Sequence, residues 1–132
     1  INPVDGIITG YFGDRINPIL NKKEFHNGLD IGADENSPAY AVKDGVVTEV
    51  GNSNTYGIYI KYETYDNYEI MYAHLNKALV KKDEKIKANQ KVGLVGSTGL
   101  STGAHLHYTV IKDGEYLDPI TLVGLPKASY LE

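Results

Sequence analysis

Short runs of Val, Ile and Tyr, each closed by residues that favour turns, recur along this chain and restrict it to a fold built of strands. Gly, Asn, Asp or Ser flank the runs and supply the backbone angles that tight turns require. Amphipathic helical patterns are few, while the 132 residues include 14 glycines and 11 tyrosines. The clearest strand candidates are residues 45–50, 58–62, 69–75, 91–95 and 105–111.

The spacing of these runs, at about 8–12 residues with turn signals between them, is typical of an antiparallel sandwich or barrel. We therefore predict an all-β, mainly antiparallel fold with little helix. Residues 77–87 form either a short helix or a loop with one helical turn. Pro38 and Pro119 lie at the edges of apolar runs, where a sheet tolerates a residue that lacks an amide proton.

Length and charge limit the kind of protein. With 132 residues, of which 42% are hydrophobic, the chain suits one domain with an ordinary core. Its 13 basic and 17 acidic residues give a net charge of −4, which excludes the usual electrostatic basis for binding nucleic acid or an anionic membrane. The absence of cysteine excludes disulfides, thiolate zinc sites and cysteine nucleophiles.

Targeting signals are missing from the sequence as it stands. No stretch approaches the roughly 20 apolar residues of a membrane span, and the first residues do not form a signal peptide. We expect one domain over residues 1–132, cut from a longer secreted or membrane-anchored protein. Any contact with a membrane would then be made through a segment outside this sequence.

The four histidines are the residues that most strongly suggest chemistry, because imidazole is the commonest metal ligand and titrates near neutral pH. His105 and His107 stand two apart in a predicted strand. Their side chains therefore project from one face while Leu106 enters the opposite, apolar side. His74 closes another apolar run.

His26 and Asp30 form a second candidate pair, four residues apart. The intervening Asn27-Gly28 is a poor helix interior, and a straight strand would separate the two Cα atoms by about 13 Å. The chain must therefore bend near Gly28 if both side chains are to meet on one ion, and glycine bends at the lowest cost.

A cluster of histidines can also be structural, with each ring satisfied by backbone carbonyls. The pairing with each other and with an aspartate favours a metal site instead. Two imidazoles and a carboxylate suit zinc and leave a fourth position for water, as in catalytic sites. Since the chain has no His-Glu-x-x-His segment, histidines outside the ligand set are the candidates for proton transfer.

These residues resemble the lysostaphin-like (LytM-type) zinc endopeptidases, a family with a duplicated hybrid-motif β fold, or barrel-sandwich hybrid, that cuts peptide bonds in bacterial peptidoglycan. Five segments carry the resemblance, which spans about residues 11 to 119. They are Tyr11-Phe12-Gly13-Asp14-Arg15 followed by Pro18, His26-x-x-x-Asp30, Tyr72-Ala73-His74, the glycine-rich segment 96–103, and His105-Leu106-His107.

The resemblance implies a role for each matching side chain. His26, Asp30 and His107 would hold one zinc ion, and His74 and His105 would be the catalytic pair. The substrate would be a peptidoglycan peptide, cut on the extracytoplasmic side of the cell. Arg15 would either bind a substrate carboxylate or hold a loop through a salt bridge.

Two other functions stay open at this point. A non-catalytic zinc-binding scaffold or activator, with a protein partner in a cell-envelope or sporulation complex, would keep the fold and lack turnover. A phosphocarrier related by fold would use a facing histidine pair and need no aspartate ligand, so Asp30 weighs against it. The bond that is cut, a glycyl-glycine bridge or a D-alanyl-diaminopimelate link, is also open, and segment 12–15 inclines us to the second.

Overall fold

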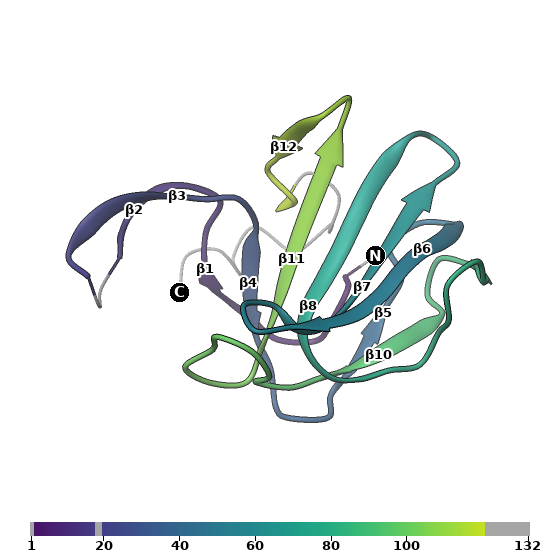
Figure 1. Ribbon diagram of the computed structural model, residues 1–132, viewed down its shortest axis with the longest axis horizontal. Coiled ribbons are helices and arrows are strands. Elements are labelled where there is room, and N and C mark those ends of the chain that lie inside the picture. Colours follow the sequence, from purple (N-terminus) through teal and green to yellow (C-terminus); the bar gives the residue numbers. More distant parts are fainter. Residues whose placement is uncertain (1, 18–19, 121–132) are drawn as a thin grey trace.

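The computed structural model describes residues 2–17 and 20–120, and every element named in them is a β-strand (Figure 1). The predicted all-β fold is confirmed. The strands are β1 (Ile7–Gly10), β2 (Gly13–Asn17), β3 (Lys22–His26), β4 (Leu29–Gly32), β5 (Pro38–Tyr40), β6 (Gly45–Ser53), β7 (Gly57–Thr64), β8 (Tyr68–Ala78), β9 (Lys85–Ile86), β10 (Lys91–Val95), β11 (His105–Lys112) and β12 (Glu115–Leu117).

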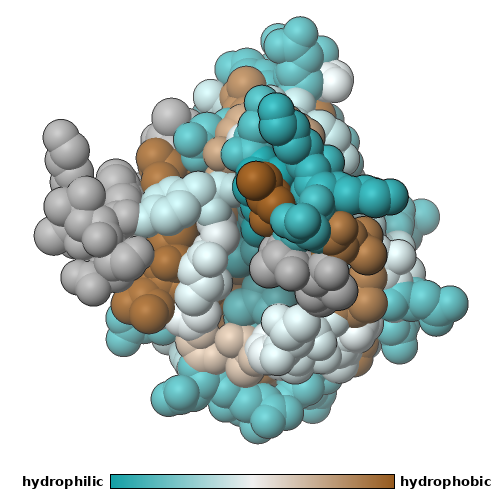
Figure 2. Space-filling view, turned by 90° about the vertical axis from the view of Figure 1, so that its left-hand side faces the viewer, coloured by the Kyte–Doolittle hydropathy of each residue, from teal (hydrophilic) through white to brown (hydrophobic). Residues whose placement is uncertain are grey.

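All pairings between these strands are antiparallel. Ten strands form one sheet in the order β1-β4-β11-β8-β7-β6-β9, with β10 paired to β5 and β8, and β12 paired to β11. The β2–β3 hairpin is a separate two-stranded sheet that projects from one side of the body (Figure 1). Viewed from that side, the surface shows apolar patches scattered among polar side chains (Figure 2).

The five segments predicted as strands all lie within strands of the large sheet. Both alternatives predicted for residues 77–87, a short helix and a loop with one helical turn, are wrong, since the segment contains no helical residue. The chain there finishes β8, passes through turns and forms β9, with Asp83 in the left-handed region at φ 72°. Val80 and Ile86 are 5% and 2% exposed, so this segment covers the core as an extended loop.

Three tyrosines join the central strands from within the core. Tyr62, Tyr72 and Tyr108 are fully buried, and their rings meet edge to face at 5.7 Å and 5.4 Å between centroids. Such pairs stabilise a core beyond the burial of their area. The Tyr72 hydroxyl donates to the Tyr40 carbonyl at 2.7 Å and lies 3.1 Å from the Tyr62 hydroxyl. Burial raises the pKa of Tyr62 to about 12, which keeps the phenol neutral.

Among the described residues no helix has the length and hydropathy needed to span a membrane.

The tyrosine cluster provides a matched test of the core. Tyr72→Phe removes a paired hydroxyl and leaves the Tyr40 carbonyl without its donor, so we expect the free energy of unfolding to fall by about 1–3 kcal/mol. The Tyr108 hydroxyl is buried and has no hydrogen-bond partner among the described residues, so Tyr108→Phe should be neutral or stabilising. Urea unfolding measures both, and equal losses would contradict the difference in pairing.

Candidate metal centre

Strands β4 and β11 pair with each other and bring the Asp30 carboxylate beside the His107 imidazole. Their register places Asp30 directly opposite His107. Leu29 and Ile31 on β4, like Leu106 on β11, are fully buried in the core. Because side chains alternate along a strand, Asp30 and His107 must both project from the other face, as the i, i+2 spacing predicted for the histidine pair.

His26, the third side chain of the set, reaches the site because the chain bends at Gly28, as predicted. β3 ends at His26 and β4 begins two residues beyond Asn27. A Cβ atom at Gly28 would lie 2.6 Å from the Tyr108 carbonyl oxygen and 3.0 Å from Cε1 of His107. Only a residue without a side chain can therefore pass this close to β11, and the passage carries His26 onto the face that Asp30 occupies.

The resulting donor set fits a metal ion. One ligand atom from each of His26, Asp30 and His107 lies within 4.8 Å of the others. His107 Nδ1 lies 2.9 Å from Asp30 Oδ1, and His26 Nε2 lies 3.2 Å from Asp30 Oδ2. Zinc–ligand bonds of 2.0–2.2 Å in a tetrahedron separate donors by about 3.4 Å, so small movements would close the set around one ion.

Hydrogen bonding prepares His26 as a ligand. Its Nδ1 lies 2.8 Å from the Tyr11 carbonyl, which can only accept, so Nδ1 carries the proton. Nε2 of the neutral ring is then an acceptor that faces another acceptor, the Asp30 carboxylate. A cation between these two atoms would bind both lone pairs and remove the repulsion between them. A bond from the far nitrogen to a carbonyl is the usual support of a metal-bound imidazole.

Asp30 is held in its charged form. Burial raises the pKa of its carboxyl, but the contacts with His107 and His26 outweigh burial and hold the pKa far below its usual range. The carboxylate is therefore ionised at neutral pH and available as a ligand.

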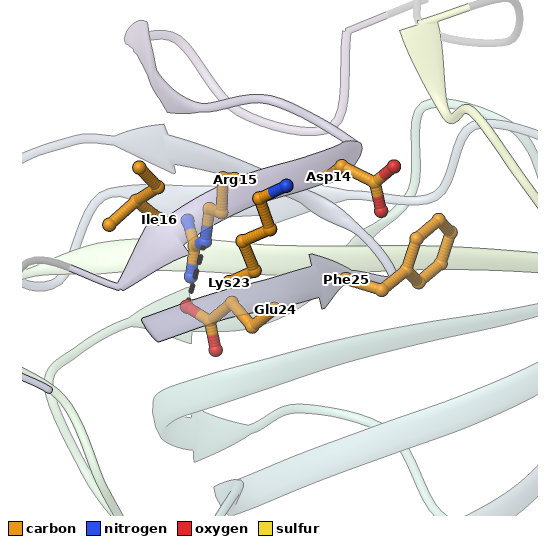
Figure 3. Close-up of a pocket in the computed structure, with 6 residues that line it drawn as sticks. All are labelled: Asp14, Arg15, Ile16, Lys23, Glu24 and Phe25. Carbon is orange, nitrogen blue, oxygen red and sulfur yellow. Dashed lines mark hydrogen bonds and ion pairs between the residues drawn. The ribbon is translucent and has the colours of Figure 1, made fainter. Parts of the chain in front are cut away.

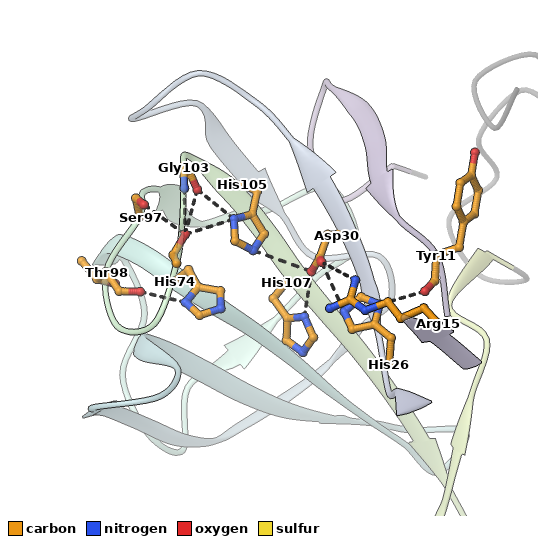
Figure 4. Close-up of polar contacts among 11 residues, drawn as sticks. Tyr11, Arg15, His26, Asp30, His74, Ser97, Thr98, Gly103, His105 and His107 are labelled. Atoms are coloured by element: carbon orange, nitrogen blue, oxygen red, sulfur yellow. Dashed lines mark hydrogen bonds and ion pairs between the residues drawn. The ribbon is translucent and has the colours of Figure 1, made fainter. Parts of the chain in front are cut away.

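His74 and His105 lie beside this set without joining it (Figure 4). The ring centroids of His74 and His105 are 4.8 Å apart, and His74 is 5.9 Å from the ring of His107. Nε2 of His105 is 3.7 Å from Asp30 Oδ1. The sequence therefore identified five side chains that the structure gathers on one face.

A local distortion of β8 turns His74 toward the centre. Ala73 pairs with His107 on β11, whereas Leu75 pairs with Val95 on β10, so the strand exchanges partners at His74. His74 has φ 63°, in the left-handed region that most residues avoid. Such strain is characteristic of functional sites, and here it breaks the alternation that would otherwise place the imidazole on the core face with Tyr72.

Both of these imidazoles are held by backbone carbonyls. His74 Nδ1 donates to Thr98 O at 2.7 Å, and His105 Nδ1 donates to Gly103 O at 2.8 Å, so each neutral ring leaves Nε2 without a proton. Burial lowers the pKa of His74 despite the Thr98 bond, and the neighbouring His105 and His107 lower it further. His74 is therefore an uncharged proton acceptor near neutral pH.

Arg15 lies on the β2–β3 hairpin and forms an ion pair. Its Nε is 3.1 Å from Glu24 Oε1 (Figure 3). Its Nη1 is 3.8 Å from Asp30 Oδ2 (Figure 4). The salt-bridge alternative is therefore present in the structure, and substrate binding by Arg15 stays a prediction. The hairpin also carries a hollow of about 440 Å³, lined by Asp14, Arg15, Ile16, Lys23, Glu24 and Phe25.

Sequence reasoning missed Tyr56, in the loop between β6 and β7. Its ring stacks on His107, with centroids 6.1 Å apart and planes inclined by 20°. The same tyrosine lines a small hollow on the sheet face that carries His107. The other lining residues are Lys61, Glu69, Met71, Thr109, Ile111 and Tyr116. A tyrosine in a turn has no pattern that would distinguish it among 11.

Residues 24–119 match the sequence pattern of peptidase family M23. The chain belongs to this family. The lysostaphin-like resemblance predicted from its motifs is thereby confirmed, and the matched segment of this M23 chain includes all five side chains of the site.

Among curated relatives, the DD-carboxypeptidase/endopeptidase Mpg of Neisseria meningitidis is 37% identical over 119 residues, which are 90% of the M23 chain and 27% of Mpg. The peptidoglycan DD-endopeptidase ShyA of Vibrio cholerae is 35% identical over 130 residues, which are 96% of the chain and 30% of ShyA. The chain thus spans less than a third of the length of these relatives.

Solved structures agree with the fold of the M23 chain. A zinc-containing peptidase from Vibrio cholerae superposes with a TM-score of 0.83 at 36% identity, covering 89% of this chain and 37% of that one. The catalytic domain of lysostaphin from Staphylococcus simulans gives a TM-score of 0.82 at 28% identity, covering 92% and 94%. Together with the donor set, these likenesses support zinc as the cofactor of the triad.

Loss of the carboxylate should empty the metal centre. We expect Asp30→Ala to abolish zinc retention, because one of only three protein ligands is removed. Zinc content per protein, measured after dialysis by atomic emission, checks this. Asp14→Ala removes an exposed carboxylate from the hairpin and should retain the metal. Equal zinc content in the two variants would refute the ligand assignment.

Proposed function

We propose that this chain is the catalytic part of a zinc endopeptidase that hydrolyses peptide bonds in peptidoglycan outside the cytoplasm. One observation carries the proposal. His26, Asp30 and His107 offer ligand atoms within 4.8 Å of one another, and the two remaining histidines stand beside them with unprotonated Nε2 atoms. A scaffold that only bound zinc would need the first three side chains and not the other two.

The bond that we propose is a D,D-peptide bond in a cross-link or stem peptide. This choice follows the activities for which Mpg and ShyA are named, since they are 37% and 35% identical, respectively, to the chain over 90% and 96% of its length. It also agrees with the inclination drawn from segment 12–15.

The metal would be held by His26 Nε2, a carboxylate oxygen of Asp30 and His107 Nδ1. Zinc bound there would lower the pKa of a water molecule and polarise the scissile carbonyl. Asp30 contributes the only negative charge of the ligand set, and its ionised state persists through the pH range in which histidines titrate.

His74 and His105 would move the protons. Hydrolysis forms a bond between the water oxygen and the carbonyl carbon, breaks the carbon–nitrogen bond, and transfers a proton from water to the departing amine. An Nε2 lone pair on a neutral imidazole can accept that proton, and the imidazolium can stabilise the oxyanion and then protonate the amine. Both rings offer this atom, so we assign the roles to the pair.

A digest of several wall types tests the substrate. Zinc-loaded protein is incubated with purified cross-linked muropeptides that contain either D-alanyl-diaminopimelate links or glycine bridges, and the products are weighed by mass spectrometry. We expect the first type to yield monomers whose combined mass exceeds that of the dimer by one water. Cleavage confined to glycine bridges would overturn the choice of bond. Tight binding without cleavage of either would favour the scaffold, with an envelope protein as its partner.

The role of His74 can be separated from its effect on the backbone. Asn tolerates the left-handed conformation that His74 adopts, so His74→Asn should preserve the fold and the zinc content. We expect its kcat to fall by roughly 10² or more, because proton transfer loses its acceptor. His74→Ala, which keeps no polar atom, should lose at least as much activity. Wild-type turnover in the Asn variant would show His74 to be a packing residue.

A further inference from the structure

The glycine-rich loop of residues 96–103 connects β10 to β11 and touches both proposed catalytic histidines. Its carbonyls at Thr98 and Gly103 accept the Nδ1 protons of His74 and His105 (Figure 4). The sequence offered no function for this loop beyond its resemblance to the family, since it lacks the ending of a phosphate-binding loop. Both contacts are made by backbone atoms, so something must hold those carbonyls in place.

The Thr98 hydroxyl anchors the first carbonyl. Thr98 Oγ1 donates to the Leu75 carbonyl at 2.6 Å and accepts from the Ile58 amide at 3.0 Å. It therefore ties the loop to the start of β7 and to the residue that directly follows His74. With the loop fixed on both sides, the Thr98 carbonyl has one position relative to the His74 ring.

Ser101 anchors the second carbonyl. Its Oγ donates to Gly103 O at 2.8 Å and lies 3.2 Å from His105 Nδ1, and it receives the Ser97 hydroxyl at 3.0 Å. Figure 4 shows polar contacts of Ser97 and Gly103 converging beside the His105 ring. A serine four residues before a histidine thus sets where that histidine finds its acceptor.

We propose that Thr98 and Ser101 are positioning residues, each of which fixes the tautomer and orientation of one catalytic histidine. The proposal rests on the proposed function for its consequence, because only a ring with its proton on Nδ1 presents a bare Nε2 to the water. If the carbonyl moved, the ring could carry its proton on either nitrogen and would spend part of its time in the form that cannot accept. Thr98 serves His74, and Ser101 serves His105.

Removing one hydroxyl at a time tests the role of Thr98 at His74 separately from the role of Ser101 at His105. Thr98→Val keeps the shape of the side chain and removes its hydrogen bonds, and Ser101→Ala does the same at the partly exposed end of the loop. Thr98→Ser and Ser101→Thr restore a hydroxyl. Thr102→Val is the matched control, since it removes an exposed hydroxyl from the same loop that contacts neither histidine among the described residues.

Three readouts are taken on zinc-loaded protein: zinc content, kcat with KM on the cleaved muropeptide, and imidazole nitrogen shifts from long-range proton–nitrogen spectra. We expect kcat to fall about 10- to 100-fold in each deletion variant, with KM and zinc content unchanged, as for other residues that orient an active side chain. The spectra should show one tautomer for both rings in the wild type, mixing only at His74 in Thr98→Val, and mixing only at His105 in Ser101→Ala.

Restored hydroxyls should return both kcat and the single tautomer. Unchanged tautomers in both deletion variants would overturn the proposal, as would equal losses in Thr102→Val. If Thr98→Val does not fold, Ser101→Ala decides at His105. The spectra need no substrate, so a wild type that cleaves nothing would end the proposed function and still leave the positioning roles measurable.

Discussion

The pairing of β4 with β11 is the interaction on which the metal centre depends. It sets Asp30 opposite His107 and, one step along, Ile31 opposite Leu106. A slip of one residue would send the ligands into the core and the apolar side chains to the surface. Because Ile31 and Leu106 are both fully buried, the same burial that forms the core also fixes the register of the ligands. The alignment of Asp30 with His107 therefore follows from the packing of the core.

Backbone carbonyls set the proton positions of three of the four histidines. Tyr11, Thr98 and Gly103 each receive an Nδ1 proton, while His107 alone turns Nδ1 toward Asp30. A carbonyl cannot change its role with pH, as a second titratable group would. A carbonyl partner on Nδ1 therefore leaves Nε2 without a proton whenever the ring is neutral.

Hydrophobic patterning predicted only some of the strands that form the core, since β4, with Leu29 and Ile31 fully buried, was not among them. The five predicted strands carry Val, Ile and Tyr on the face that the core buries. The hairpin of β2 and β3 was not predicted, because its side chains are mostly polar and partly exposed and its strands pair with each other. The loop at residues 77–87 was assigned a helical alternative because two buried residues, Val80 and Ile86, do not define a period.

The five side chains that the structure gathers on one face could be identified from the sequence for a different reason. Histidine is scarce, with four in the chain, and is the commonest metal ligand, so its spacing from other histidines and from an aspartate is informative even without a structure. Contacts made through the backbone, such as those from Thr98, have no such signature. The same holds for the stacking of Tyr56 and for the left-handed conformation of His74, which arises because β8 exchanges neighbours there.

The metal ligands come from distant parts of the sequence, since Asp30 and His107 lie 77 positions apart. The unfolded chain does not hold their ligand atoms together, so an ion at this site would bind the folded domain in preference to the unfolded chain. Such selective binding would stabilise the fold increasingly as the concentration of free metal rises, in a chain whose lack of cysteine excludes disulfides. The three ligands would therefore link the stability of the domain, as well as its chemistry, to the supply of zinc.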